Sequence, residues 1–292
     1  MRSIRELLFY KIILSGLRIT EGLRHRAEQI ASFIGAAALA GLSKDSLRRL
    51  TDAIYGCKDT YGDDKLFDWE REWLAADLPP PPAKILLGGA GSGREVLSLS
   101  AQGYEILAFD PVLRFVKNAR LSIGCQPGVE FVQGSYEDIV SNETPQAQKL
   151  HTAIKRFVPY DAVVLGWSSF THIIDTATRV QLLKRLYQLC PNGPVLLSFW
   201  MRDESEPSRA RGRAYRLGTA IGTTMGSHTS DRHKVETGDV ITGHAGFCHS
   251  FTLEEIELCV RQAGYSVSPH KPDWLVEAFP HMTLLPPLHR IR

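Results

Sequence analysis

The chain has 292 residues, of which 43% are hydrophobic and 23% charged, and its formal net charge is +2. This is ordinary globular composition, and the near-neutral balance gives no electrostatic reason to expect a nucleic acid as partner. The five cysteines are scattered without a CxxC spacing, which favours reduced thiols in a cytoplasmic protein over a disulfide framework or a zinc site.

Residues 1–76 are expected to be helical, because apolar residues recur there at helical spacing. The opening run RELLFYKIILSGL is interpreted as an amphipathic helix rather than a signal peptide, since Lys11 interrupts it. No apolar run reaches the roughly 18 residues of a membrane span, so no membrane partner is expected. Four prolines at 79–82 form a stiff spacer, and we place the boundary to a second domain, residues 84–292, at this point.

From Lys84 onwards, apolar strands alternate with helices. Five strands are predicted, in KILLGG, YEILAFD, VEFVQG, YDAVVLGW and VLLSFW. This alternation is typical of a parallel, doubly wound sheet with helices on both faces. Two further strands are predicted in YSVSPH and WLVEAF, and the link KPD between them is too short for a crossover helix, so they must pair antiparallel. The predicted fold is an α/β, Rossmann-like sheet of seven strands with an N-terminal helical extension.

The first predicted strand runs into the glycine-rich segment ILLGGAGSGRE. Glycine permits both the dihedral angles of a tight turn and the close approach of a ligand to the backbone. The amide groups at the start of the following helix favour a carboxylate or a phosphate. Asp110 ends the next strand, where an acidic side chain can accept hydrogen bonds from both hydroxyls of a ribose. A nucleoside-binding crevice is therefore predicted at the carboxyl ends of these strands.

The GxGxG spacing, Asp110, the segment YDAVVLGWSSF and the closing hairpin together resemble the class I S-adenosylmethionine (SAM)-dependent methyltransferase family. The resemblance covers residues 84–280 and implies SAM as the cofactor. It implies that Gly89, Ala90, Gly91 and Gly93 line the methionine part of SAM and that Asp110 binds the ribose. It also implies that Ser135 and Tyr136 border the adenine and that Gly166 and Trp167 close the floor of the site near the methyl group. Pro111 is a further predicted cofactor-binding residue.

Two positions depart from the family pattern. Many members carry an acid in the first strand where this chain has Leu87, so the SAM ammonium group must find backbone carbonyls or another acid. The family often places Asp where this chain has Ser135, whose oxygen is a weaker acceptor. Glu95 has two interpretations, either favourable placement at the positive end of a helix or contact with the cofactor.

The acceptor side of the site is predicted from two segments. The polar, glycine-rich stretch from Met201 to Ser250 lies where the family commonly inserts a substrate cover. Arg209 and Arg213 in this stretch share a helical face, which is either a solvated surface or a clamp for a carboxylate or phosphate. The predicted substrate residues are Ser168, Arg209, Arg213 and Tyr215, although packing is an alternative role for Tyr215.

Two histidines are candidates for proton transfer. His172 follows the fourth strand, in the loop that faces the transferring methyl group in the family, and its ordinary pKa suits a general base. His249 precedes the last helix and is a candidate pocket residue. His244 and His249 are expected to point in opposite directions on one strand, so no metal site is predicted. A base is not obligatory, because alignment with a reactive sulfonium supplies much of the acceleration.

The favoured interpretation is a methyltransferase acting on an oxygen or nitrogen of a small molecule or short peptide, with a carboxylate-bearing acceptor as the first candidate. By family analogy, a tailoring role in natural-product metabolism fits. Two alternatives stay open: a non-catalytic scaffold subunit, because of Leu87 and Ser135, and a nicotinamide-dependent oxidoreductase, if Gly88 starts the glycine motif. The N-terminal helices have two compatible interpretations: they cover the site, with Tyr55, Tyr61 and the segment KLFDWEREW near the cofactor, or they form a homodimer interface.

Overall fold

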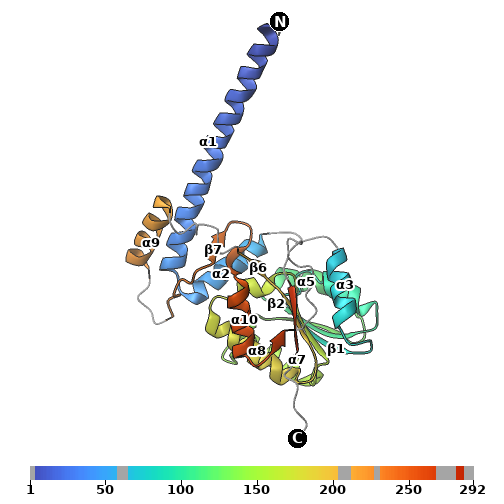
Figure 1. Cartoon of the computed structure of the whole chain (residues 1–292). Helices are drawn as coiled ribbons and strands as arrows, with labels where there is room; N and C mark the ends of the chain where they lie inside the picture. The colour runs from blue at the N-terminus through green and yellow to red at the C-terminus, as the bar shows by residue number, and fades with distance from the viewer. Residues whose placement is uncertain (1–3, 58–64, 203–211, 227–230, 268–280, 286–292) are drawn as a thin grey trace.

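The computed structural model describes residues 4–57, 65–202, 212–226, 231–267 and 281–285. A mixed α/β body carries a long helix that projects away from it (Figure 1). Within these ranges the helices are α1 (Ile4–Gly41), α2 (Lys44–Gly56), α3 (Asp68–Asp77), α4 (Arg94–Ser100), α5 (Leu113–Ile123), α6 (Tyr136–Val140), α7 (Pro145–Phe157), α8 (Thr176–Leu189), α9 (Arg213–Met225) and α10 (Leu253–Gln262), together with the 3-10 turn η1 (Ser169–His172).

The strands form a seven-stranded sheet of order β3-β2-β1-β4-β5-β10-β9 and a three-stranded sheet of order β6-β8-β7. Their bounds are β1 (Lys84–Gly88), β2 (Glu105–Asp110), β3 (Val129–Gln133), β4 (Ala162–Leu165), β5 (Val195–Ser198), β6 (Trp200–Met201), β7 (Asp239–Thr242), β8 (Gly246–Phe251), β9 (Ser266–Val267) and β10 (His281–Leu285). Strands β1 to β5 run parallel, and β10 pairs antiparallel with both β5 and β9. The predicted α/β architecture is confirmed.

The position of the last strand differs from the sequence prediction. The strand beside β5 is His281–Leu285, not the segment WLVEAF, which lies within 268–280 and so outside the described residues. The link between the two closing strands is therefore much longer than the three residues assumed. The antiparallel pairing was predicted correctly, but the argument from a short link was wrong.

The central strands are buried on both faces, which explains their nearly continuous apolar sequence. Alternate residues of β1 point to opposite sides: Leu86 packs in the core under α6, α7, α8 and α10, whereas Ile85 and Leu87 pack in the core under α4 and α5. All three side chains have no exposed surface. This rigid centre positions the loops at the carboxyl ends of β1, β2 and β4.

The stretch predicted as a substrate cover contains α9 and β7, and α9 lies beside the base of α1 (Figure 1). The two helices approach closely at Gly218 and Gly222. A Cβ atom on either glycine would lie 2.2 Å from a carbonyl oxygen of α1, that of Phe33 or that of Ala37.

Among the described residues, no helix combines the length and the apolar character that crossing a membrane requires.

We expect the substitution Gly222→Ala to destabilise the protein by about 1–3 kcal/mol, because the added methyl group forces α9 away from the backbone of α1. Urea unfolding followed by circular dichroism measures the change. Gly22→Ala is the matched control, since a Cβ atom at Gly22 on α1 meets no atom within 4 Å. That variant should be neutral or more stable by about 0.5–1 kcal/mol, and equal destabilisation of both variants would contradict the packing argument.

Candidate active site

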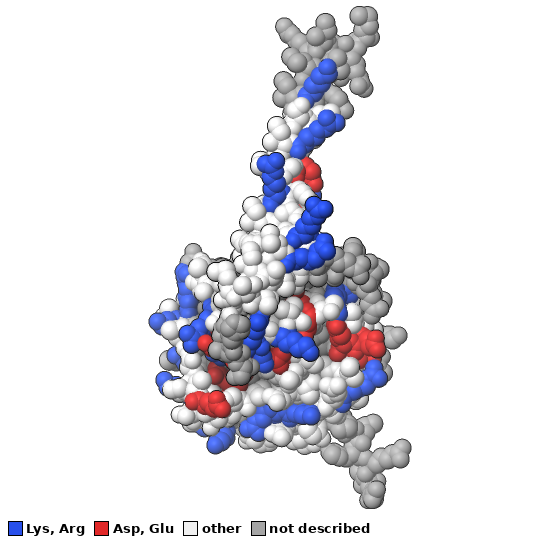
Figure 2. Space-filling view, turned by 90° about the vertical axis from the view of Figure 1, so that its left-hand side faces the viewer, with Lys and Arg blue, Asp and Glu red and all other residues white. Residues whose placement is uncertain are grey.

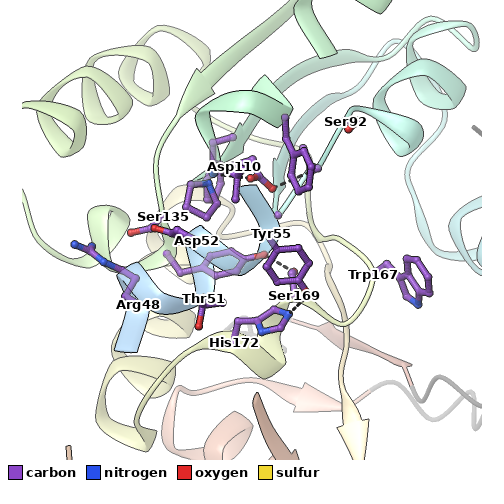
Figure 3. A pocket seen from close by; sticks show the side chains of 18 of the residues that line it. Arg48, Thr51, Asp52, Tyr55, Ser92, Asp110, Ser135, Trp167, Ser169 and His172 are labelled. Atoms are coloured by element: carbon purple, nitrogen blue, oxygen red, sulfur yellow. Dashed lines mark hydrogen bonds between the residues drawn. The ribbon is translucent and has the colours of Figure 1, made fainter. Parts of the chain in front are cut away.

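A cavity opens beside the carboxyl ends of β1, β2 and β4 (Figure 3), and its empty volume, open mouth included, is about 1000 Å³. Cavities of this size commonly hold small molecules and cofactors. The walls come from the loops after these strands, from the starts of α4 and α6, and from α2. Of the predicted site residues, those that line the cavity are Gly89, Ala90, Gly91, Asp110, Pro111, Ser135, Tyr136, Trp167 and His172.

The loop from β1 to α4 has a left-handed backbone at three of its glycines. The φ angles of Gly89, Gly91 and Gly93 are 65°, 51° and 93°, a conformation that strains residues with a Cβ atom. A Cβ atom on Gly89 would also lie 2.5 Å from the Cβ atom of Ser169, whereas one on Gly91 would meet no protein atom within 4 Å. Gly91 therefore borders open space, and its backbone leaves that space free for a ligand.

Gly93 and Gly166 support this loop without lining the cavity. A Cβ atom on Gly93 would lie 3.2 Å from that of Ala119, so this glycine permits α4 to pack against α5. The amide of Gly166 donates to the carbonyl oxygen of Gly88 at 2.8 Å, which joins the end of β4 to the end of β1. Gly166 also borders a smaller cavity, which shares Trp167 with the larger one.

Asp110 connects the glycine loop to the end of β2. Its Oδ2 accepts a hydrogen bond from the amide of Gly91, and its Oδ1 accepts one from the amide of Val112, both at 2.9 Å. Burial raises the pKa of Asp110 to about 7, although the two backbone hydrogen bonds oppose the shift. Each carboxylate oxygen has further lone pairs, so the group can also accept hydrogen bonds from a ligand.

Ser135 and Tyr136 are both held by other side chains. The Oγ of Ser135 caps α6 by accepting from the amide of Asp138, and it donates to the carboxylate of the same residue at 3.1 Å. The hydroxyl of Tyr136 hydrogen-bonds with the Oγ of Ser169 at 2.5 Å, and its ring meets Phe109 edge to face. Ser135 thus contributes to the wall with its oxygen already engaged, whereas Tyr136 fixes the position of the loop after β4.

One face of α2 also lines the cavity. Its members Arg48, Thr51, Asp52 and Tyr55 recur at intervals of three and four residues and line the cavity (Figure 3). Of this face, the sequence predicts only Tyr55 near the cofactor; Tyr61, predicted beside it, lies outside the described residues. The polar stripe on an otherwise ordinary helix was the signal available in the sequence.

His172 and Tyr55 form a hydrogen-bonded pair at the side of the cavity. The Nδ1 of His172 lies 2.8 Å from the carbonyl oxygen of Phe247, and its Nε2 lies 3.0 Å from the hydroxyl of Tyr55 (Figure 3). Because a carbonyl oxygen only accepts, the neutral ring carries its proton on Nδ1 and leaves Nε2 as the acceptor. The backbone of β8 thus orients His172 with a basic nitrogen toward Tyr55.

The cavity wall carries more acidic than basic side chains. The acidic residues are Asp52, Glu95, Asp110 and Glu137, and the basic ones are Arg48 and Arg94. Burial raises the pKa of Asp52 to about 6 and also raises the pKa of Glu137, and Arg48 opposes both shifts. Such a wall favours a ligand that carries positive charge.

The predicted acceptor residues are not brought together at the cavity. Ser168 is next to two lining residues, but it is not itself in the wall, and its amide donates to the Oγ of Ser198. Arg213 and Tyr215 lie on α9, which packs against α1, and neither lines the cavity. Arg209 falls outside the described residues.

Solved structures with a similar fold are SAM-dependent methyltransferases. The CcbJ methyltransferase from Streptomyces caelestis aligns with a TM-score of 0.51 at 13% identity, over 80% of this chain and 98% of that one. A SAM-dependent methyltransferase from Methanosarcina mazei aligns with a TM-score of 0.49 at 16% identity, over 76% of this chain and 98% of that one. No protein-family model and no curated protein sequence matches the chain. The resemblance predicted from the sequence is thus confirmed at the level of the fold.

His249 belongs to a separate buried cluster. Its Nδ1 and the Nε2 of His233 each lie 2.7 Å from one carboxylate oxygen of Asp239, and none of these residues lines the cavity. Oxygen and nitrogen atoms of Glu236, Asp239 and His249 lie within 4.8 Å of one another, but the carboxylate of Glu236 is already paired with Arg179 at 3.0 Å. The cluster connects β7 to β8, and so supports the strand that orients His172.

We expect Asp239→Asn to lower the free energy of unfolding by about 2–4 kcal/mol at pH 7, because it breaks two buried charge-assisted hydrogen bonds. Burial alone would raise the pKa of Asp239, but the hydrogen bonds from His233, His249 and the amide of Glu236 outweigh it and leave the pKa below its usual range. A carboxyl group with a lowered pKa stabilises the fold above its unfolded pKa. The difference between wild type and variant, measured by urea unfolding, should therefore narrow as the pH falls through about 4; a difference independent of pH would contradict this.

Proposed function

We propose that this chain is a SAM-dependent methyltransferase. The observation that carries the proposal is the contact between Asp110 and the amide of Gly91, which brings a buried carboxylate to a glycine loop bordering open space. A carboxylate at the end of the second strand suits the hydroxyls of a ribose, and the acidic wall suits a cationic ligand. The fold, shared with SAM-dependent methyltransferases, supports the same conclusion.

The cofactor, when bound, supplies a methyl group on a sulfonium ion. The residues proposed to contact it are Gly89, Ala90, Gly91, Asp110, Pro111, Ser135, Tyr136 and Trp167, and Gly93 and Gly166 are proposed to support the loops that carry them. Asp110 binds the ribose. Tyr136 and the rim formed by Pro111 and Ser135 border the adenine, and Trp167 excludes water near the methyl group.

His172 is the proposed proton acceptor. Its Nε2 points into the cavity toward Tyr55, and Nδ1 is held by the carbonyl oxygen of Phe247. An acceptor hydroxyl or amine that approaches beside Tyr55 can pass its proton to the hydroxyl oxygen of Tyr55, while Tyr55 passes its own proton to Nε2 of His172. When bound, the cofactor would supply the methyl group to the oxygen or nitrogen of that acceptor and would remain as S-adenosylhomocysteine. His249 has no comparable position, because Asp239 holds it outside the cavity.

The proposed acceptor is a small molecule or short peptide that enters beside α2. If the acceptor bears a carboxylate, Arg48 is the guanidinium on that face of the cavity, with Asp45 as its partner at 2.8 Å. A role in natural-product tailoring and a cytoplasmic location are part of the same proposal. The helix α2 covers the acceptor side, which is the covering role considered for residues 1–76.

Calorimetric titration tests this function. We expect the full chain to bind S-adenosylhomocysteine and not NADH, and Asp110→Ala to weaken that binding by about 10- to 150-fold, because hydrogen bonds to a charged acceptor are lost. Since burial raises the pKa of Asp110 to about 7 and the ionised form is the better acceptor, wild-type affinity should rise from pH 6 to pH 8. The affinity of the variant should lack this step.

Binding of NADH alone would replace the proposal with an oxidoreductase. Binding of neither ligand would favour a scaffold subunit. Unchanged affinity in Asp110→Ala, with a wild-type circular dichroism spectrum, would show that the ribose assignment is wrong.

We further propose that two copies of the chain pair through α1. The helix projects from the body and exposes large apolar side chains among its basic residues (Figures 1 and 2). Leu17 and Leu23 are 62% and 59% exposed. A stripe of exposed residues at intervals of three and four consists of Ile13, Leu17, Thr20, Leu23, Ala27, Ile30 and Ile34. This spacing is typical of a coiled coil, so a second α1 is the occupant that fits.

We expect the full chain to be a dimer in size-exclusion chromatography with light scattering. The double variant Leu23→Glu/Ile30→Glu should be a monomer, because it buries charges in the stripe. His25→Glu adds the same group to another face of α1 and should remain dimeric. A monomeric wild type at micromolar concentration would overturn the proposal, as would a dimer that survives both stripe substitutions.

A further inference from the structure

A buried charge cluster lies where the glycine loop enters α4. The guanidinium of Arg94 binds both carboxylate oxygens of Glu70 on α3, at 2.6 and 2.7 Å, and one oxygen of Glu95 at 2.8 Å. The three side chains are only 5–8% exposed. The cluster therefore joins the N-terminal segment to the glycine loop through charges that are almost completely removed from water.

The cluster contains two carboxyl groups but only one guanidinium. Glu70 and Glu95 share the single guanidinium of Arg94, and no other cationic side chain among the described residues pairs with either carboxylate. A buried carboxylate without a full counter-charge is costly, and a cation supplied by a ligand removes that cost. Burial correspondingly raises the pKa of Glu95, although Arg94 opposes the shift.

The guanidinium of Arg94 is held by its neighbours, so the carboxylate of Glu95 is the group of this cluster that can bind a ligand. It lies over the rings of Phe67 and Trp167, 5.0 and 5.3 Å from their centroids, and donates to the carbonyl oxygen of Lys65 at 3.3 Å. Its nitrogens are thus directed to Glu70, Glu95 and the backbone. Glu95 lines the same cavity as Asp110, with the glycine loop between them.

The first strand offers no acid at this end of the cavity. Leu87 has no exposed surface and packs in the core under α4 and α5. Its side chain is not part of the cavity wall. Glu95 also borders the smaller cavity behind Trp167, which places its carboxylate at the boundary between the two spaces.

We propose that Glu95 binds the ammonium group in the amino-acid part of the cofactor. The inference rests on the proposed function and goes further, because it predicts which ligands the site distinguishes. A nucleoside that carries the amino-acid chain gains a contact with Glu95, whereas one without that chain gains none. Arg94 is a positioning residue, which orients the carboxylate and ties it to α3.

The test compares three ligands by calorimetric titration of the full chain: S-adenosylhomocysteine, methylthioadenosine, which lacks the amino-acid chain, and deaminated S-adenosylhomocysteine, which lacks only the ammonium group. In Glu95→Gln we expect S-adenosylhomocysteine to bind about 10- to 100-fold more weakly and methylthioadenosine to bind as in wild type. Asp110→Ala is the matched control, and it should weaken both ligands.

The deaminated ligand completes a double-mutant cycle, in which one change removes the carboxylate of Glu95 and the other removes the ammonium group of the ligand. Wild type should bind it about 10- to 100-fold more weakly than S-adenosylhomocysteine, and Glu95→Gln should bind the two almost equally. If Glu95→Gln does not fold, the wild-type comparison alone decides: equal affinity for both ligands overturns the inference. Unchanged affinity of a folded Glu95→Gln for S-adenosylhomocysteine also overturns it. Failure of wild type to bind any of the three ligands would instead refute the proposed function.

Discussion

The site depends on the two hydrogen bonds that Asp110 accepts from the amides of Gly91 and Val112. They hold the glycine loop against the end of β2. The left-handed backbone of that loop therefore borders the cavity and leaves its space open. The strands beneath are buried on both faces and cannot shift to compensate. A carboxylate is therefore required twice at this position, first to order the loop and then to receive a ligand.

The N-terminal segment completes the site from the other side. Glu70 of α3 binds Arg94 at the glycine loop, and Tyr55 of α2 binds His172 near the loop after β4. Neither contact involves the central sheet, so the sheet alone would present an open crevice. Both contacts join sequence-distant segments through polar side chains, and they add to the apolar packing of Leu47 on α2 and Leu74 on α3.

Much of the fold could be predicted because its signals are local. Alternating strands and helices, glycines after β1 and an acid at the end of β2 each depend on a few neighbouring residues. Of the α2 face, Arg48, Thr51 and Asp52 could not be assigned to the cavity, since a helix so far before β1 in the chain reaches it only through tertiary packing. Likewise, α9 packs on α1 because Gly218 and Gly222 allow close approach, and this contact carries Arg213 and Tyr215 away from the cavity. His249 was misleading because its partner, Asp239, lies on the neighbouring strand.

Leu87 is the position where a local prediction and the three-dimensional structure lead to different conclusions. Taken alone, an apolar residue in place of an acid argues for a weakened cofactor site. In the structure Leu87 fills the core, and Glu95 on the next helix lines the cavity. Glu95 shares the single guanidinium of Arg94 with Glu70. All the charged groups around a buried site determine its charge together, because burial strengthens the electrostatic interactions between them. The acid that a ligand needs can therefore move from strand to helix, provided that a fixed guanidinium such as Arg94 orients it.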